Sequence, residues 1–159
     1  MSININDYLP DVNFFYMSAS GPKKIGTKEL FDNKKIILVG VPGAFTPTCS
    51  LEHLPSFIQN KDNFFSKGIE KIIFMSVNDP FVISEWSKSH NEDDILFIGD
   101  SSGEFASKTG LKMDLSVIGL GTRLSRFAML VDNGQVKLIF DEEGGDLKKS
   151  TASIVLDSI

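Results

Sequence analysis

Short apolar runs alternate along the chain with stretches of helical period. Residues 35–41 and 70–77 are apolar without alternation, which is typical of strands covered on both faces. Between them, Leu51, Leu54, Phe57, Ile58 and Phe65 recur at helical spacing. A helix is therefore expected after residue 50, kinked at Pro55 and ended at Gly68.

Turn and cap residues predict the remaining elements. Strands are expected at residues 12–16 and 95–98, and a turn at residues 18–24. Helices are expected at residues 27–33 (capped by Thr27), 81–89 (capped by Asp79, with Pro80 in its first position), 102–109 (ended by Gly110) and 147–159. A hairpin of residues 124–131 and 135–140 is expected around Asp132-Asn-Gly134. This order predicts the α/β class, with a mixed central sheet flanked by helices on both faces. Its last half resembles the thioredoxin arrangement, so a thioredoxin-like fold is expected. Because no linker or repeat divides the sequence, residues 1–159 are expected to form a single domain.

Composition and charge exclude several classes of protein. The hydrophobic share of 42% is ordinary for a globular chain, and a net charge of -5 does not favour nucleic acid as a partner. No apolar stretch approaches the roughly 20 residues of a membrane span, and the N-terminus lacks the pattern of a signal peptide. The single cysteine cannot form an internal disulfide, which fits a reducing, cytoplasmic location.

That cysteine, Cys49, follows the strand at 35–41 and opens the next helix. A helix N-terminus favours the thiolate, which is the form that attacks, although a lone cysteine can also be a small buried hydrophobe. Thr46 stands where a dithiol site would have its second cysteine, and its hydroxyl can hydrogen-bond the sulfur or an oxygen atom near it. Pro42 and Pro47 can stiffen and shield the loop.

The spacing Pro42-x-x-x-Thr46-x-x-Cys49 resembles the active-site motif of the peroxiredoxins. Residues 41–50 together resemble the subgroup called type-five or type-II (atypical) peroxiredoxins. Further matches to that subgroup are Ser76-Val-Asn-Asp-Pro-Phe-Val82, Glu85-Trp86 and Gly119-Leu-Gly-Thr-Arg-Leu-Ser-Arg-Phe127. The resemblance spans nearly the whole chain.

This resemblance implies a thiol-dependent peroxidase acting on hydrogen peroxide and alkyl hydroperoxides without a metal or cofactor. It implies that Cys49 attacks the terminal peroxide oxygen and becomes a sulfenic acid. Thr46 would orient the peroxide, Pro42 would shield the sulfur and Arg126 would complete the site. A guanidinium suits this role because it stays protonated and can hydrogen-bond both the sulfur and the peroxide.

His53 lies four residues after Cys49, so on a helix the two share a face and could form a zinc site or a thiol–imidazole pair. Zinc is not expected, because the chain has no second cysteine and only one other histidine. The resemblance instead suggests that His53 lines or supports the edge of the site, which Phe45 and Pro47 would narrow.

The chain departs from the subgroup where many members carry a second, resolving cysteine, because Phe74 and Lys149 occupy those places. A one-cysteine enzyme is therefore expected, reduced from outside by glutathione with glutaredoxin or by thioredoxin. The resemblance also implies a homodimer. Two alternatives remain open: a redox sensor or holdase that uses the same thiol, and a cysteine hydrolase with His53 as its base.

Overall fold

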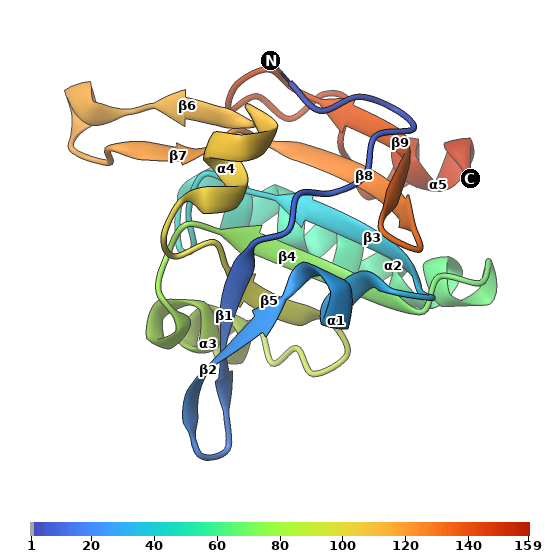
Figure 1. The fold of residues 1–159 in the computed structure, drawn as a ribbon, viewed down its shortest axis with the longest axis horizontal. Coiled ribbons are helices and arrows are strands. Elements are labelled where there is room, and N and C mark those ends of the chain that lie inside the picture. The colour runs from blue at the N-terminus through green and yellow to red at the C-terminus, as the bar shows by residue number, and fades with distance from the viewer. Residues whose placement is uncertain (1) are drawn as a thin grey trace.

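The computed structural model describes residues 2–159 (Figure 1). The strands are β1 (Asn13–Ser18), β2 (Gly21–Gly26), β3 (Lys35–Gly40), β4 (Lys71–Ser76), β5 (Leu96–Gly99), β6 (Lys112–Asp114), β7 (Thr122–Leu124), β8 (Phe127–Asp132) and β9 (Gln135–Asp141). The α-helices are α1 (Thr27–Phe31), α2 (Leu54–Ser66), α3 (Pro80–Ser89), α4 (Glu104–Thr109) and α5 (Ala152–Ser158), with a π-helical turn η1 (Cys49–His53) and a 3-10 turn η2 (Ser116–Ile118). Among the described residues, no helix is both long and apolar enough to cross a bilayer.

A seven-stranded mixed sheet in the order β2-β1-β5-β4-β3-β8-β9 forms the centre of the fold. Strands β3, β4 and β5 run parallel, whereas β8 pairs with β3 in the antiparallel sense. The carboxyl ends of β3 and β4 therefore meet at one edge of the sheet, together with the start of β8. Strands β6 and β7 form a separate two-stranded arm that projects from the body in Figure 1.

Two apolar layers cover the sheet, one on each face. Along β3, Ile37 and Val39 pack into the core beside α2, α3 and α5, whereas Ile36 and Leu38 pack into the core beside α1 and α4. All four side chains are fully buried, and burying one such side chain stabilises a fold by about 1.5–3 kcal/mol. This burial explains why β3 reads as a continuous apolar run, and it confirms the expectation for residues 35–41.

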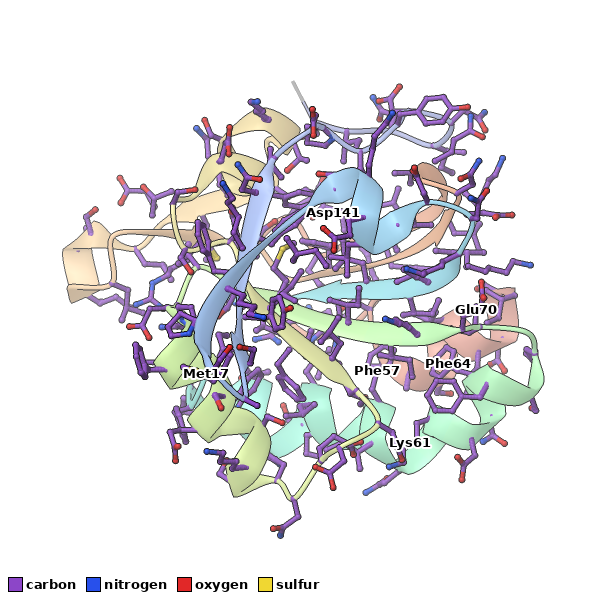
Figure 2. All side chains as sticks on the ribbon, turned by 60° about the horizontal axis from the view of Figure 1, so that its bottom comes forward. Met17, Phe57, Lys61, Phe64, Glu70 and Asp141 are labelled. Atoms are coloured by element: carbon purple, nitrogen blue, oxygen red, sulfur yellow. The ribbon has the colours of Figure 1, made fainter. Side chains whose placement is uncertain are left out.

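Aromatic rings fill the layer between α2 and the sheet. Phe57 and Phe64 of α2 stack with their ring centroids 5.4 Å apart, and both lie between the helix and the strands (Figure 2). Phe74 of β4 meets Phe57 edge to face at 5.5 Å. Phe57 and Phe74 also lie edge to face against His53, at 5.6 and 5.8 Å, so this aromatic layer packs against the turn η1 that begins at Cys49.

Several expectations about local structure are confirmed. Asp79 accepts a hydrogen bond from the backbone N–H of Val82 and caps α3, which has Pro80 in its first turn. Gly110 ends α4 in the left-handed conformation. Asn133 and Gly134 both have positive φ, as the two-residue turn between β8 and β9 requires.

The expectation of a turn over residues 18–24 was wrong, because this segment turns at only two residues and then forms β2. Ser18 pairs with Gly21, and six residue pairs join β1 to β2. Strand β2 reads GPKKIG, which has no apolar alternation. Its strand conformation is set by pairing with β1 rather than by a local pattern.

Two helix beginnings also differ from expectation. Thr27 is the first residue of α1 rather than its cap, and its hydroxyl donates to the Pro10 carbonyl at 2.6 Å. The last helix begins at Ala152 instead of residue 147, with Thr151 as its cap. Lys148 and Lys149 therefore lie in a turn that precedes the helix, and not on a helix face.

A third difference bears on the site. The single strand expected over residues 124–131 is broken, because β7 ends at Leu124 and β8 begins at Phe127. At the break, the backbone N–H of Arg126 donates to Gly144, and the Arg126 carbonyl accepts from the backbone N–H of Glu142. This local pairing with the segment that follows β9 places the Arg126 side chain at the edge of the sheet where β3 ends.

Candidate active site

Cys49 lies at the start of the π-helical turn η1, and its side chain is fully buried. The backbone N–H of Leu54 reaches back five residues to the Cys49 carbonyl. The next residue, Pro55, has no N–H to offer and lies in the first turn of α2, where a missing donor leaves no helical hydrogen bond unmade. The turn leaves Cys49 and His53 both buried against the same apolar layer.

Arg126 supplies the positive charge beside the sulfur. Its Nη2 donates to Cys49 Sγ at 3.2 Å, and its Nε donates to the Gly145 carbonyl at 3.0 Å. Only 2% of the arginine is exposed. From this position the guanidinium can stabilise negative charge that develops near the sulfur, and its burial leaves little water to screen the interaction.

His53 supports the guanidinium from inside the protein. Its Nδ1 lies 2.8 Å from Arg126 Nη1, and its Nε2 lies 2.9 Å from the Ser150 carbonyl. Since arginine can only donate, Nδ1 must be the unprotonated nitrogen and Nε2 must carry the proton that goes to Ser150. Burial, followed by the charge of Arg126, lowers the pKa of His53 to about 3. The ring is therefore neutral and fully buried. It supports the site through its contact with Arg126 and does not line the edge of the site.

This geometry does not suit the two other roles considered for His53. Both ring nitrogens are engaged, one by Arg126 and one by Ser150, so neither faces the thiol as a general base of a cysteine hydrolase would. Among residues 2–159, no group of three or more potential ligands is arranged to hold a metal ion.

Stability should depend on His53 as the solution is acidified. The folded pKa of about 3 lies below the unfolded value of 6.5, so the unfolded chain binds an extra proton between these two pH values. The free energy of unfolding should therefore be full above pH 6.5 and fall below it, by about 1 kcal/mol between pH 7 and pH 5.5. Urea denaturation at the two pH values measures this loss. In a His53→Gln variant the loss should be smaller by that amount, and an equal loss in both proteins would contradict the assignment.

The loop before the cysteine is stabilised by hydrogen bonds of its own. Thr46 donates its hydroxyl to the Gly43 carbonyl at 2.7 Å, so its oxygen lone pairs remain free to accept a proton donor such as a peroxide O–H. No hydrogen bond joins this hydroxyl to the sulfur in the structure of residues 2–159. Pro42 is buried, whereas Pro47 and Phe45 are exposed on the outer side of the loop. Phe45 also has a positive φ of 65°, a conformation that tertiary contacts must hold.

Two polar residues that the sequence did not single out anchor this loop. Arg123 Nη1 donates to the Pro42 carbonyl at 3.0 Å, and Asn78 Oδ1 accepts from the Ala44 N–H at 2.9 Å. A Cβ at Gly43 would lie 2.6 Å from Arg123 Nη1, so a larger residue there would displace the guanidinium from its present position. Arg123 and Asn78 both fall in stretches that carry the family resemblance, but nothing local to either residue indicates the carbonyl or amide that it binds.

The helical side of the cysteine has an anchor as well. Trp86 of α3 is fully buried and donates its indole N–H to the Ser50 hydroxyl at 2.9 Å. A hollow of the described surface lies elsewhere, between the N-terminal segment, α1 and the β8–β9 turn, and none of the site residues lines it. The candidate nucleophile therefore lies among buried, hydrogen-bonded side chains at the end of β3.

The arrangement is suited to nucleophilic attack by sulfur on a small polar electrophile. Cys49 provides the nucleophile, Arg126 provides donors where negative charge develops, and Thr46 provides an acceptor that can orient the incoming molecule. Of the residues expected at the site, Cys49, His53 and Arg126 are brought into one hydrogen-bonded chain. Pro42 and Thr46 lie in the adjoining loop.

Comparison with known proteins gives the same picture over the full length. The model of the Redoxin family matches residues 4–156. Among curated proteins, the chain is 41% identical to Peroxiredoxin-2D of Arabidopsis thaliana over 159 residues, covering 99% of this chain and 98% of that one.

Two solved structures are similarly close. Reduced Prx3 from Vibrio vulnificus in complex with H2O2 superposes with a TM-score of 0.94 at 36% identity, covering 98% of both chains. The Plasmodium falciparum antioxidant protein, described as a 1-Cys peroxiredoxin, superposes with a TM-score of 0.93 at 30% identity, again covering 98% of both chains. These matches confirm the expected thioredoxin-like peroxiredoxin fold.

Proposed function

This chain belongs to the redoxin family and is a peroxiredoxin thiol peroxidase with a single cysteine, and from that premise we propose that it reduces hydrogen peroxide and alkyl hydroperoxides through a sulfenic acid at Cys49. The observation that carries the proposal is the 3.2 Å contact between Arg126 Nη2 and Cys49 Sγ, because it couples a permanent cation to the only thiol of the chain. A relative with a TM-score of 0.94 was solved with H2O2 bound, which supports hydrogen peroxide as a substrate here.

In this reaction the Cys49 thiolate attacks the outer oxygen of the peroxide. An S–O bond forms as the O–O bond breaks, and the leaving oxygen takes a proton and departs as water or an alcohol. Arg126 stabilises the negative charge that moves onto the leaving oxygen, and Thr46 accepts a hydrogen bond from the peroxide O–H. The product is a sulfenic acid at Cys49.

Recycling must come from outside, because no second cysteine is present to attack the sulfenic acid. We propose glutathione as the first reductant. Its thiolate attacks the Cys49 sulfur and releases water, and glutaredoxin then takes the glutathione from the mixed disulfide. The full burial of the sulfur supports a small thiol, which reaches it with less rearrangement than a protein such as thioredoxin.

Mass spectrometry should detect this intermediate. After one equivalent of hydrogen peroxide, the protein should react with a sulfenic-acid probe at Cys49, and with excess glutathione it should carry one glutathione adduct instead. Steady-state peroxide consumption with glutathione, glutaredoxin and glutathione reductase should follow. Rapid turnover with thioredoxin and its reductase, together with no adduct and no turnover with glutathione, would contradict glutathione as the first reductant. The assignment as a peroxidase would still stand.

We also propose that two copies pair through the surface around the cysteine loop. Five exposed apolar side chains lie on the cysteine loop, η1, the start of α3 and the β6–β7 arm: Phe45, Leu51, Phe81, Val117 and Ile118. The cysteine loop and the start of α3 lie at the edge of the sheet where β3 ends, and the β6–β7 arm, whose η2 turn carries Val117 and Ile118, projects on the same side in Figure 1. An exposed apolar surface of this kind marks an association site.

Sedimentation velocity should show a dimer that a Phe81→Lys substitution weakens, because it places a charge in the apolar surface. A wild-type protein that is monomeric at micromolar concentration would contradict the proposed dimer.

A further inference from the structure

The carboxylate of Glu142 holds the turn that precedes α5. A single oxygen, Oε2, accepts the backbone N–H groups of Lys148 at 2.9 Å, Lys149 at 2.7 Å and Ser150 at 2.8 Å, and also the Ser150 hydroxyl at 2.9 Å. Desolvation by itself would raise the pKa of Glu142, but these hydrogen bonds outweigh it and lower the pKa. Three consecutive N–H groups pointing at one oxygen form a small anion-binding nest, and here the anion is the protein's own side chain.

The nest is connected to the sulfur by an unbroken chain of hydrogen bonds. Its last residue, Ser150, offers its carbonyl to His53 Nε2 at 2.9 Å. His53 Nδ1 accepts from Arg126 Nη1 at 2.8 Å, and Arg126 Nη2 donates to Cys49 Sγ at 3.2 Å. Ser150 and His53 are fully buried and Arg126 is nearly so, which means that water cannot replace a lost link.

The main chain adds a second connection between Glu142 and Arg126. The Glu142 N–H donates to the Arg126 carbonyl at 3.0 Å, and the Arg126 N–H donates to Gly144 at 2.8 Å. Residues 142–150 form neither helix nor strand, so their conformation depends on hydrogen bonds such as these. The carboxylate is the group that ties the two ends of this segment together.

We propose that Glu142 is a positioning residue of this peroxidase: by fixing the Ser150 carbonyl it sets the orientation and tautomer of His53, and so directs the Arg126 guanidinium at Cys49 Sγ. The proposal rests on the peroxidase function proposed above. Without the negative charge of the carboxylate, its hydrogen bonds to the three N–H groups are weaker and the Ser150 carbonyl is held less firmly. The imidazole then no longer holds the guanidinium in place, and both the thiolate and the transition state lose stabilisation.

The test replaces Glu142 with glutamine, which keeps the size of the side chain but removes its charge. In Glu142→Gln, oxidation of Cys49 by hydrogen peroxide should be about 10-fold slower in stopped-flow measurements. The rate of iodoacetamide alkylation of Cys49 at pH 6 should fall by about three- to tenfold, because the guanidinium no longer stabilises the attacking sulfur. Glu143→Gln is the matched control, because it removes the same charge from the exposed neighbour, and it should change both values by less than twofold. Wild-type behaviour of Glu142→Gln in both measurements would overturn the proposal.

A double variant distinguishes positioning from a general loss of structure. If Glu142 acts through Arg126, then Glu142→Gln should slow oxidation by less than twofold in an Arg126→Ala background, since no guanidinium remains to be positioned. A further 10-fold loss in that background would show that Glu142 acts independently of Arg126.

If Glu142→Gln does not fold, Ser150→Ala provides a second test, because it removes only the hydroxyl that donates to Glu142. This variant should slow oxidation by about threefold, and a wild-type rate would count against the proposal. The alkylation measurement needs no peroxide, so it tests the positioning even if the wild-type protein proved not to turn over hydroperoxides.

Discussion

Replacing Cys49 with serine should abolish peroxide reduction while leaving the fold intact. The hydroxyl is close to the thiol in size and can keep the hydrogen bond from Arg126, so the buried site stays filled. It remains protonated and is a far weaker nucleophile towards a peroxide oxygen, so the first step of the reaction is lost. Peroxide consumption with excess glutathione and glutaredoxin measures the activity, and urea denaturation measures the free energy of unfolding.

More than a tenth of wild-type activity in a folded Cys49→Ser protein would show that Cys49 is not the nucleophile. The same variant also tests the sensor alternative, because a sensor oxidises once and then waits. Wild-type protein that consumes many equivalents of peroxide per cysteine, beside an inactive Cys49→Ser protein, is the result expected of an enzyme.

Local patterns in the sequence predicted the core of this fold well. The run that includes residues 36–41 is apolar because β3 is central and buried on both faces. Burial on both faces requires apolar residues at successive positions, and this pattern can be recognised in the sequence. The hairpin around Asn133 and Gly134 was predictable for a similar reason, since its turn requires two residues that tolerate positive φ. Cys49 could be placed at a strand–helix junction from these neighbouring patterns alone.

Elements that depend on a distant partner were not predictable in this way. Residues 21–26 form strand β2 because they pair with β1. Helix α5 begins later than expected, and the backbone N–H groups just before it donate to the Glu142 carboxylate. In neither case does the local sequence carry a sign of the partner. The break between β7 and β8 likewise reflects the pairing of Arg126 with residues beyond β9.

The site shows the same division. The Pro-Thr-Cys spacing identified the loop, and the family resemblance identified Arg126, which lies 77 residues from the cysteine. The role of His53 required the structure, because only the approach of Arg126 on one side and Ser150 on the other fixes its tautomer. Since these contacts join three separate segments, no spacing within any one of them encodes the network.

The other large effect is expected from Arg126. Removing its side chain in Arg126→Ala deletes the donor at 3.2 Å from Cys49 Sγ, and so removes stabilisation from both the thiolate and the developing charge. Oxidation by hydrogen peroxide should slow by about 100-fold or more, which corresponds to about 2.7 kcal/mol of transition-state stabilisation. Stopped-flow measurement of the second-order rate constant for both proteins at one fixed pH gives this loss directly.

Arg126→Lys separates the charge from the geometry. A lysine restores the positive charge but cannot contact Cys49 Sγ, His53 Nδ1 and the Gly145 carbonyl at the same time, so it should recover less than a tenth of the lost rate. Lys137→Ala, which removes a positive charge from the exposed face of β9, should leave the rate unchanged. Full recovery in Arg126→Lys would mean that the charge alone is sufficient and that the hydrogen-bonded chain through His53 adds nothing to the rate. A wild-type rate in folded Arg126→Ala would remove the arginine from the mechanism altogether.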